Sequence, residues 1–417
     1  MTFHTLSLPS AVLALSLVLP LRASAAKFYT YVGAIGTESV VLAWGTTDGG
    51  NTIGRTSRSH GKAKVRIGTQ QVEVADQNWA SVEGLQPDTE YEYEVTLNGT
   101  RVGAGKVRTW PVKADRLRFF VIGDFGSGDS HQRAVAQSMW KEFQKHEGTS
   151  NPVRFIATTG DNLYGAIGLT LRFRNTGAED RDWEEKFYAP YEPVIGRIPF
   201  YASLGNHDGN ETESRADLTT YLDNFFFPSP QPARYYRFSY GGMADFFALD
   251  STTNSETGSP RPAYLRSGDQ HKWLEKNLAE SQVPWKIPFL HHPPYNAGPR
   301  HPSAKNELAH FLELFRKHGV RVVFSGHEHN FQYTRANNET GNIRYVISGA
   351  GGELREGDVR SEMDRAQTEG WAPQLHFLSV EIEGSEMRVL PVGPETIRVR
   401  DRSGREIAMP LRIPARD

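Results

Sequence analysis

Five short polar clusters hold most of the residues in this chain that could do chemistry. They are Gly123-Asp124-Phe125-Gly126, Gly160-Asp161-Asn162-Leu163-Tyr164, Gly205-Asn206-His207-Asp208, His291-His292-Pro293 and Gly326-His327-Glu328-His329-Asn330. Each follows an apolar run that predicts a β-strand, and open α/β sheets bind their ligands at such strand ends. A single Gly-Asp pair is usually a turn or a helix N-cap. Together, however, the Asp, Asn, Tyr and His residues predict a metal site with oxygen and imidazole ligands.

Composition narrows the kind of site further. The chain has 417 residues and no cysteine, which excludes disulfides, thiolate zinc sites, iron–sulfur clusters and cysteine nucleophiles. A bound metal must therefore use oxygen ligands and some of the 14 histidines. The formal net charge of −2 gives no electrostatic reason to expect nucleic acid or an anionic membrane as a partner.

The elements that must position these clusters fall into two kinds of pattern. Residues 28–110 show short apolar runs separated by turn signals, which predicts an all-β module. Within it, the run Leu85-x-Pro87-x-Thr89-x-Tyr91 resembles the tyrosine corner of fibronectin type III domains. We expect a structural or docking module here.

From Leu117 onward, apolar strands alternate with helical patterns, which predicts an α/β fold. Strands are expected at 119–122, 153–158, 198–204, 287–290 and 320–324, and helices at 131–146, 269–281 and 304–318. Residues 235–249 and 375–390 instead have the pattern of antiparallel hairpins. The prediction is two stacked mixed sheets flanked by helices.

The order of the five clusters resembles the calcineurin-like metallophosphoesterases and, within them, the purple acid phosphatases. The resemblance runs from about Leu117 to Gly352 and includes a Phe-Pro-Ser-Pro run at 227–230, the pair Leu249-Asp250 and the turn Ser348-Gly349-Ala350-Gly351. The catalytic part is most similar to the small, mammalian-type tartrate-resistant acid phosphatases. A fibronectin-like front module is instead similar to that of the larger plant and bacterial members.

One departure from the wider superfamily bears on the metal. Most members have Asp-x-His in the first cluster, whereas this chain has Asp124-Phe125-Gly126. Tyr164, three residues after Asp161, takes the place of that His, as in purple acid phosphatases. A phenol with a pKa of about 10 becomes a ligand only beside a hard, highly charged ion. Tyr164 therefore argues for Fe(III) in one of two positions.

The resemblance also implies which residues bind each metal. It gives Asp124, Asp161, Tyr164 and His329 to the ferric site and Asn206, His291 and His327 to a divalent site, with Asp161 bridging both. The divalent ion could be Fe, Zn or Mn, because Asn, His and Asp donors suit all three. The family spacing His-x-Pro selects His291, and His292 stays open as the alternative.

The implied function is an exported acid phosphatase that hydrolyses phosphate monoesters by attack of a metal-bridging or metal-bound hydroxide, releasing inorganic phosphate. His207 and His301 match the family's outer-sphere histidines, and His207 is the candidate general acid. Asp208 and Asn330 are expected to orient neighbouring groups. Two alternatives stay open: a phosphodiesterase or nucleotide pyrophosphatase on the same metal centre, and a non-catalytic surface adhesion or binding protein.

The N-terminus has the pattern of an export signal. An apolar run from Leu8 to Leu21 precedes Ala23-Ser24-Ala25, the small-x-small pattern that signal peptidases cleave. Such a run is short for a membrane span, so we expect a secreted or periplasmic chain and no stable membrane insertion. The expected divisions are a signal peptide at 1–25, a fibronectin III-like sandwich at 26–112, a binuclear catalytic domain at 115–392 and a C-terminal extension at 393–417.

Overall fold

The computed structural model describes residues 27–47, 53–55, 61–165, 183–208, 219–227, 233–252, 264–360 and 364–416. The expected signal peptide and the Pro-Ser-Pro part of the run at 227–230 lie outside these residues. Within the described ranges, no helix is both long and apolar enough to cross a membrane.

The described N-terminal residues form an all-β module, as predicted. One sheet has the order β1 (Tyr29–Ile35), β2 (Ser39–Gly45) and β5 (Trp79–Glu83), and the other has β4 (Gln70–Ala75), β3 (Lys62–Ile67), β6 (Glu90–Leu97) and β7 (Thr100–Arg108). The Tyr91 hydroxyl accepts a hydrogen bond from the Gln86 N–H at 2.8 Å, which is the kind of contact that a tyrosine corner makes.

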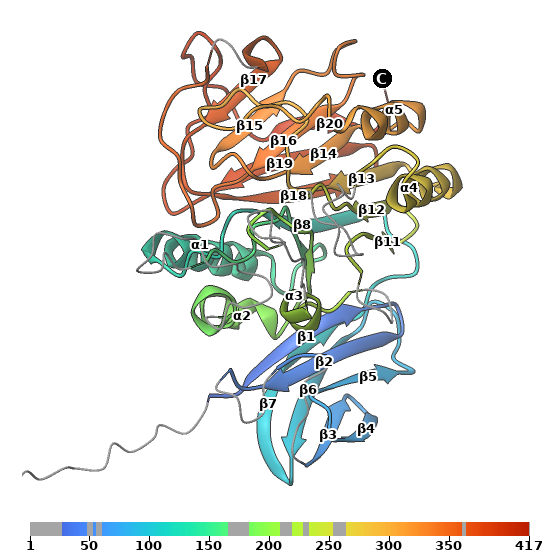
Figure 1. The fold of residues 1–417 in the computed structure, drawn as a ribbon. Coiled ribbons are helices and arrows are strands. Elements are labelled where there is room, and N and C mark those ends of the chain that lie inside the picture. Colours follow the sequence, from blue (N-terminus) through green and yellow to red (C-terminus); the bar gives the residue numbers. More distant parts are fainter. Residues whose placement is uncertain are drawn as a thin grey trace, which may run out of the picture.

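The rest of the described chain is built around two larger mixed sheets (Figure 1). The first has the order β10 (Phe200–Ala202), β9 (Val153–Thr158), β8 (Arg116–Ile122), β18 (Phe377–Glu383), β19 (Glu386–Val392) and β20 (Leu411–Pro414). The second has β11 (Tyr236–Tyr240), β12 (Ala244–Ala248), β13 (Trp285–Phe289), β14 (Val322–Ser325), β16 (Arg344–Ser348), β15 (Phe331–Thr334) and β17 (Thr368–Ala372). Strand β20 comes from the expected C-terminal extension, yet it pairs with β19 as an edge of the first sheet.

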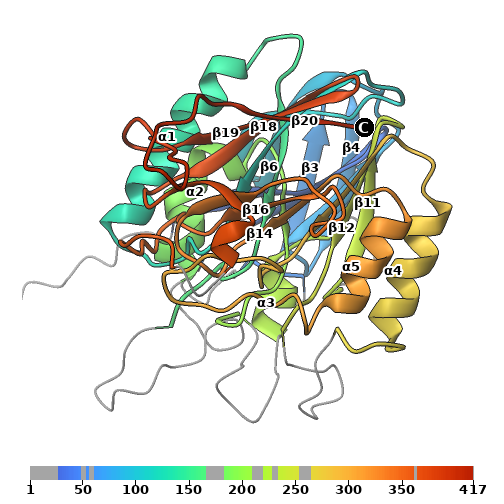
Figure 2. The same cartoon turned by 90° about the horizontal axis from the view of Figure 1, so that it is seen from above.

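The described helical segments are α1 (Ser130–His146), the π-helical turn η1 (Glu184–Tyr188), α2 (Ala189–Ile195), α3 (Thr219–Asn224), α4 (Asp269–Glu280), α5 (Ala309–Lys317) and the 3₁₀ turn η2 (Asp364–Ala366). Four of them, α1, α2, α4 and α5, flank the two mixed sheets (Figure 2). Figure 2 shows α1 and α2 on one side and α4 and α5 on the other. This is the predicted layering, although α5 begins at Ala309 rather than near residue 304 because residues 305–308 form turns.

Aromatic side chains fill the space between the two mixed sheets. The ring of Phe119 on β8 stacks on Phe155 of β9 and meets Phe246 of β12 edge-on, each with ring centroids 5.1 Å apart. All three side chains are buried. Because β8 and β9 end at two of the polar clusters, this packing fixes where those clusters begin.

The N-terminal module packs directly against the segments around α2 and α3. The Glu184 carboxylate accepts hydrogen bonds from the hydroxyls of Tyr29 at 2.7 Å and Thr47 at 2.6 Å. At Gly33 a Cβ atom would lie 2.5 Å from the Phe226 ring, so only glycine allows this close approach. The hydrophobic core accordingly runs without a break from the module into the mixed sheets.

A charged contact also joins the module to β9. The Asp88 carboxylate lies 2.9 Å from the Arg154 guanidinium and 3.0 Å from that of Arg108. Burial opposes ionisation of Asp88, but the two arginines outweigh it and hold the pKa of this carboxyl below its usual value. A folded-state pKa below the unfolded one stabilises the fold above the unfolded pKa, and this stability is lost as the pH falls through the folded pKa.

Asp88→Asn is therefore expected to lower the melting temperature at pH 7, because it leaves the buried Arg154 without its carboxylate partner. The difference in melting temperature between variant and wild type should shrink as the pH falls from about 4 through the lowered folded-state pKa of Asp88, because the wild-type carboxylate then also becomes neutral. Thermal unfolding followed by circular dichroism between these pH values measures the gap. Asp115→Asn, at an exposed aspartate, is the control. A gap that does not change with pH would contradict the assignment.

Candidate metal centre

The five polar clusters meet where the strands of both sheets end. Asp124, Asp161 and Asn206 follow β8, β9 and β10 of one sheet, whereas His291 and His327 follow β13 and β14 of the other. The structure thus brings together side chains that are far apart in the sequence. Their arrangement agrees with the prediction made from strand ends.

Backbone geometry at these strand ends is unusual. Asp124, Asp161 and His327 have φ values of 55°, 48° and 70°, in the left-handed region that few non-glycine residues adopt. Gly205 lies so close to Asp161 that a Cβ atom on it would be 2.1 Å from the Asp161 carboxylate. Such strained residues gather at functional sites, where the surrounding structure holds them in place.

One group of side chains forms around Tyr164. Its hydroxyl donates to Asp124 Oδ1 at 3.1 Å and lies 3.2 Å from His329 Nε2. His329 Nε2 is in turn 3.4 Å from Asp124 Oδ1. These three atoms therefore form a compact triangle of possible ligands.

A second group forms around His291. Its Nδ1 lies 2.8 Å from the Thr159 carbonyl, which can only accept, so Nδ1 carries the proton and Nε2 has a free lone pair in the neutral ring. That Nε2 atom is 2.9 Å from Asn206 Oδ1, 3.1 Å from His327 Nδ1 and 3.4 Å from Asp161 Oδ1. Several lone pairs thus point at one another.

These groups fit two cations. Two ligands bound at right angles to one ion, each ~2.1 Å from it, lie ~3 Å apart, which is the spacing within both groups. Oxygen or nitrogen atoms of Asp124, Asp161 and His291 also lie within 4.8 Å of one another, so Asp161 stands between the two groups. Carboxylate, phenol, amide and imidazole donors suit hard and borderline metals.

The pKa shifts agree with a centre that favours positive charge. Burial opposes protonation of His291, but Asp161 and Asp124 outweigh it and raise its pKa to about 10. Burial raises the pKa of the Tyr164 phenol well above its usual value, and the carboxylates of Asp124 and Asp161 raise it further. A cation at this place would lower both pKa values.

Comparison with known proteins identifies the family. The family profile for calcineurin-like phosphoesterases matches residues 117–331, which is more than half of the chain. The chain belongs to the calcineurin-like phosphoesterase family. It is 28% identical to human tartrate-resistant acid phosphatase type 5 over 304 residues, which cover 66% of this chain and 86% of that protein. It is 24% identical to purple acid phosphatase 15 of Arabidopsis thaliana, over 65% of this chain and 52% of the plant protein.

Solved structures show the same fold at low identity. The purple acid phosphatase PPD1 from yellow lupin seeds superposes with a TM-score of 0.66 at 15% identity, covering 92% of this chain and 73% of that one. PhoD superposes with a TM-score of 0.65 at 13% identity, covering 92% of each chain. Both extend over the N-terminal module as well as the phosphoesterase part.

The structure also brings the predicted outer histidines of this phosphoesterase to the centre. The backbone N–H of His207 donates to Asp161 Oδ1 at 2.9 Å, and its ring centroid is 4.6 Å from that of Tyr164. The ring of His301 lies 3.9 Å from that of His327. Both histidines are partly exposed, so a substrate could reach them.

His292 lies beside the second group, so it stays an alternative to His291. Its ring centroid is 4.5 Å from that of His327, and its Nδ1 is 3.0 Å from the Ser251 hydroxyl. Potential ligand atoms of the three histidines all lie within 4.8 Å of one another. Burial lowers the pKa of His292 to about 3, so this ring is neutral in the absence of metal.

Asp208 holds two of the clusters together. Its carboxylate accepts backbone hydrogen bonds from Asn162 at 3.0 Å, Leu163 at 3.2 Å and Gly205 at 2.9 Å. Burial raises its pKa to about 7. The expected orienting role fits these contacts. Asn330 contacts a different segment, because its amide donates to the Gly298 carbonyl at 3.0 Å.

Three groups that contact the histidines of the centre were not predicted from the sequence. The Thr159 backbone carbonyl, the Ser251 hydroxyl and the Glu328 carboxylate each contact a histidine of the centre or its backbone. Only Glu328 carried a signal, because it is an acidic residue between two predicted ligands. A backbone carbonyl has none in a single sequence.

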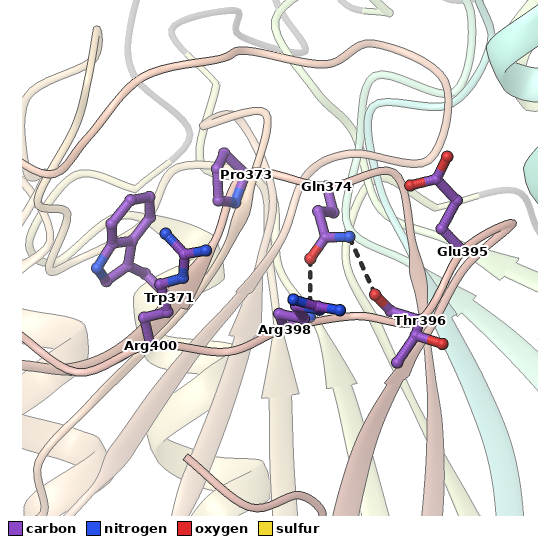
Figure 3. A pocket seen from close by; sticks show the side chains of 7 residues that line it. All are labelled: Trp371, Pro373, Gln374, Glu395, Thr396, Arg398 and Arg400. Carbon is purple, nitrogen blue, oxygen red and sulfur yellow. Dashed lines mark hydrogen bonds between the residues drawn. The ribbon is translucent and has the colours of Figure 1, made fainter. Parts of the chain in front are cut away.

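A separate hollow of about 440 Å³ lies on the surface, and Figure 3 shows it. It is lined by Trp371, Pro373, Gln374, Glu395, Thr396, Arg398 and Arg400. Gln374 ties its walls together through hydrogen bonds to Thr396 and Arg398. None of these residues belongs to the five clusters, so the hollow is distinct from the metal centre.

Asp161→Asn is expected to reduce metal retention by at least ~10-fold, because it removes the charge that both groups share. The Asn oxygen can still accept the His207 N–H, so the loop should keep its shape. Metal content per chain after dialysis, measured by plasma mass spectrometry, tests this. Asp245→Asn, at a buried carboxylate bound to Arg237, is the matched control. Unchanged metal content in Asp161→Asn would refute the assignment.

Proposed function

We propose that this phosphoesterase is an exported acid phosphatase that hydrolyses phosphate monoesters at a centre of Fe(III) and a divalent ion. The observation that carries the proposal is the pair of ligand groups with Asp161 between them. The relatives named acid phosphatases support the reaction class. The apolar run and Ala23-Ser24-Ala25 support export.

The first group would hold the trivalent ion. Asp124, Tyr164 and His329 would bind it together with Asp161, and the raised pKa of the Tyr164 phenol favours an ion of high charge. The second group of Asn206, His291 and His327 would hold Fe, Zn or Mn. When bound, such a pair polarises the phosphoryl group and activates water.

Other residues of the chain would orient the ligands and contact the substrate. Thr159 fixes the His291 ring so that Nε2 faces the centre, and Asp208 holds the loops of Asp161 and Asn206 together. The backbone N–H of His207 is fixed by Asp161, and its ring lies beside that of Tyr164. Its place at the partly exposed side suits a group that contacts phosphate and gives a proton to the leaving oxygen.

His207→Ala is expected to lower kcat for 4-nitrophenyl phosphate by ~100-fold. The loss should be larger with phenyl phosphate, because its poorer leaving group depends more on a proton donor. Steady-state kinetics at acid pH measures both, with His131→Ala at an exposed histidine of α1 as the control. An equal loss with both esters would contradict the general-acid role. Preference for bis(4-nitrophenyl) phosphate would indicate a phosphodiesterase instead.

Tyr164→Phe is expected to abolish a visible absorption band of the purified protein, because the band requires a phenolate bound to Fe(III). Absorption spectra and iron content, recorded on the same samples, test this. Tyr333→Phe, at a buried tyrosine outside the five clusters, should leave the band in place. A colourless, iron-free wild type with full activity would refute the ferric site.

A further inference from the structure

Glu328 stands between His327 and His329 in the sequence, but its carboxylate belongs to a different set of contacts. The side chain is fully buried. A buried carboxylate is costly unless it is well satisfied by hydrogen bonds or charge. Its partners therefore indicate what the residue is for.

One carboxylate oxygen of Glu328 accepts hydrogen bonds from a single loop. Oε2 accepts hydrogen bonds from the backbone N–H of His301 at 2.8 Å, the backbone N–H of Arg300 at 3.1 Å and the Asn296 side-chain amide at 3.2 Å. All three donors belong to residues 296–301, the loop that carries His301. Charge-assisted hydrogen bonds of this kind are stronger than neutral ones.

The other oxygen faces a cation. Oε1 lies 3.6 Å from Arg355 Nη1, and neither atom has a closer hydrogen-bond partner among the described residues. The backbone N–H of Arg355 donates to the His329 carbonyl at 2.9 Å. Arg355 thus balances the buried charge and is itself tied to the ligand segment.

The backbone of His301 is held on both sides. Its N–H is bound by Glu328, and its carbonyl accepts from Asn296 Nδ2 at 2.8 Å. Asn296 is buried, and its Oδ1 accepts from Gln332 Nε2 at 3.1 Å. The His301 ring is thereby kept with its centroid 3.9 Å from that of His327.

We propose that Glu328 is a positioning residue that fixes His301 against the metal centre. Its catalytic consequence rests on the proposed function, whereas its effect on the loop does not. Oε2 is saturated by three donors from the loop, which favours positioning over metal ligation. The two neighbouring histidines reach the centre, and the residue between them anchors the loop above it.

The first test is independent of activity. Glu328→Leu keeps the volume but removes every acceptor, so amide exchange at Arg300 and His301 should accelerate by at least ~10-fold in the metal-free protein. Glu328→Gln should restore most of the protection, because its amide oxygen can replace Oε2. Glu307→Leu, at an exposed glutamate of the next segment, is the control. Hydrogen–deuterium exchange with residue-level readout measures all four proteins.

Wild-type exchange at Arg300 and His301 in a folded Glu328→Leu protein would overturn the proposal. Should Glu328→Leu fail to fold, Glu328→Gln decides. Its weaker, neutral acceptor is expected to accelerate exchange at these two amides by a few-fold, with no change in β13 or β14. Wild-type exchange at both amides in that variant would equally overturn the proposal.

The second test links the loop to catalysis through a double-mutant cycle. Glu328→Leu should lower kcat for 4-nitrophenyl phosphate on the order of 10-fold with little change in KM, because His301 is misplaced. In a His301→Ala background, Glu328→Leu should lower kcat for the same ester by less than ~3-fold. If the loss of kcat in the double variant equals the product of the losses in the two single variants, Glu328 does not act through His301. A wild type without phosphatase activity would refute the proposed function, and the exchange test would still decide the position of His301.

Discussion

The convergence of lone pairs at one place is the constraint on which the rest of this structure depends. His291 Nε2 has Asn206, His327 and Asp161 atoms within 3.4 Å, and its other nitrogen is already committed to Thr159. Such an arrangement needs positive charge at its centre. The pKa of His291, raised to about 10, shows the same preference, because a proton on this ring supplies positive charge when no metal is bound. Left-handed residues at strand ends and the close approach of Gly205 can be understood as the backbone cost of bringing these atoms together.

The structure that holds these strained strand ends in place extends beyond the two mixed sheets. Arg154 on β9 is bound by Asp88 of the N-terminal module, and β9 ends at the cluster of Asp161. Glu184 and Phe226, on segments beside the first sheet, are held by the same module. The module is therefore part of the scaffold of the centre, and it shares the hydrophobic core of the phosphoesterase part.

Strand-end clusters made the location of the centre predictable, because the periodicity of apolar runs locates strand ends and parallel strands bring those ends to one edge. Which side chains of each cluster would bind metal was implied by the family resemblance instead. The role of Glu328 could not be predicted, since its three donors lie 27 to 32 residues earlier in the sequence. The Thr159 carbonyl was hidden for another reason, because every residue has one. Likewise, β20 pairs with β19 after a long connection, and no local pattern shows that Leu411–Pro414 completes a sheet.

The choice between His291 and His292 illustrates how the surroundings of a ring decide its chemistry. The Thr159 carbonyl fixes the proton of His291 on Nδ1 and leaves Nε2 as a donor to metal. Ser251 Oγ already accepts the backbone N–H of His292, so its own proton is available to His292 Nδ1. In that tautomer Nε2 of His292 carries the ring proton, so this nitrogen offers no lone pair to a cation. This tautomer would make His291 the ligand and His292 the hydrogen-bond donor, which is the assignment that the family spacing implies.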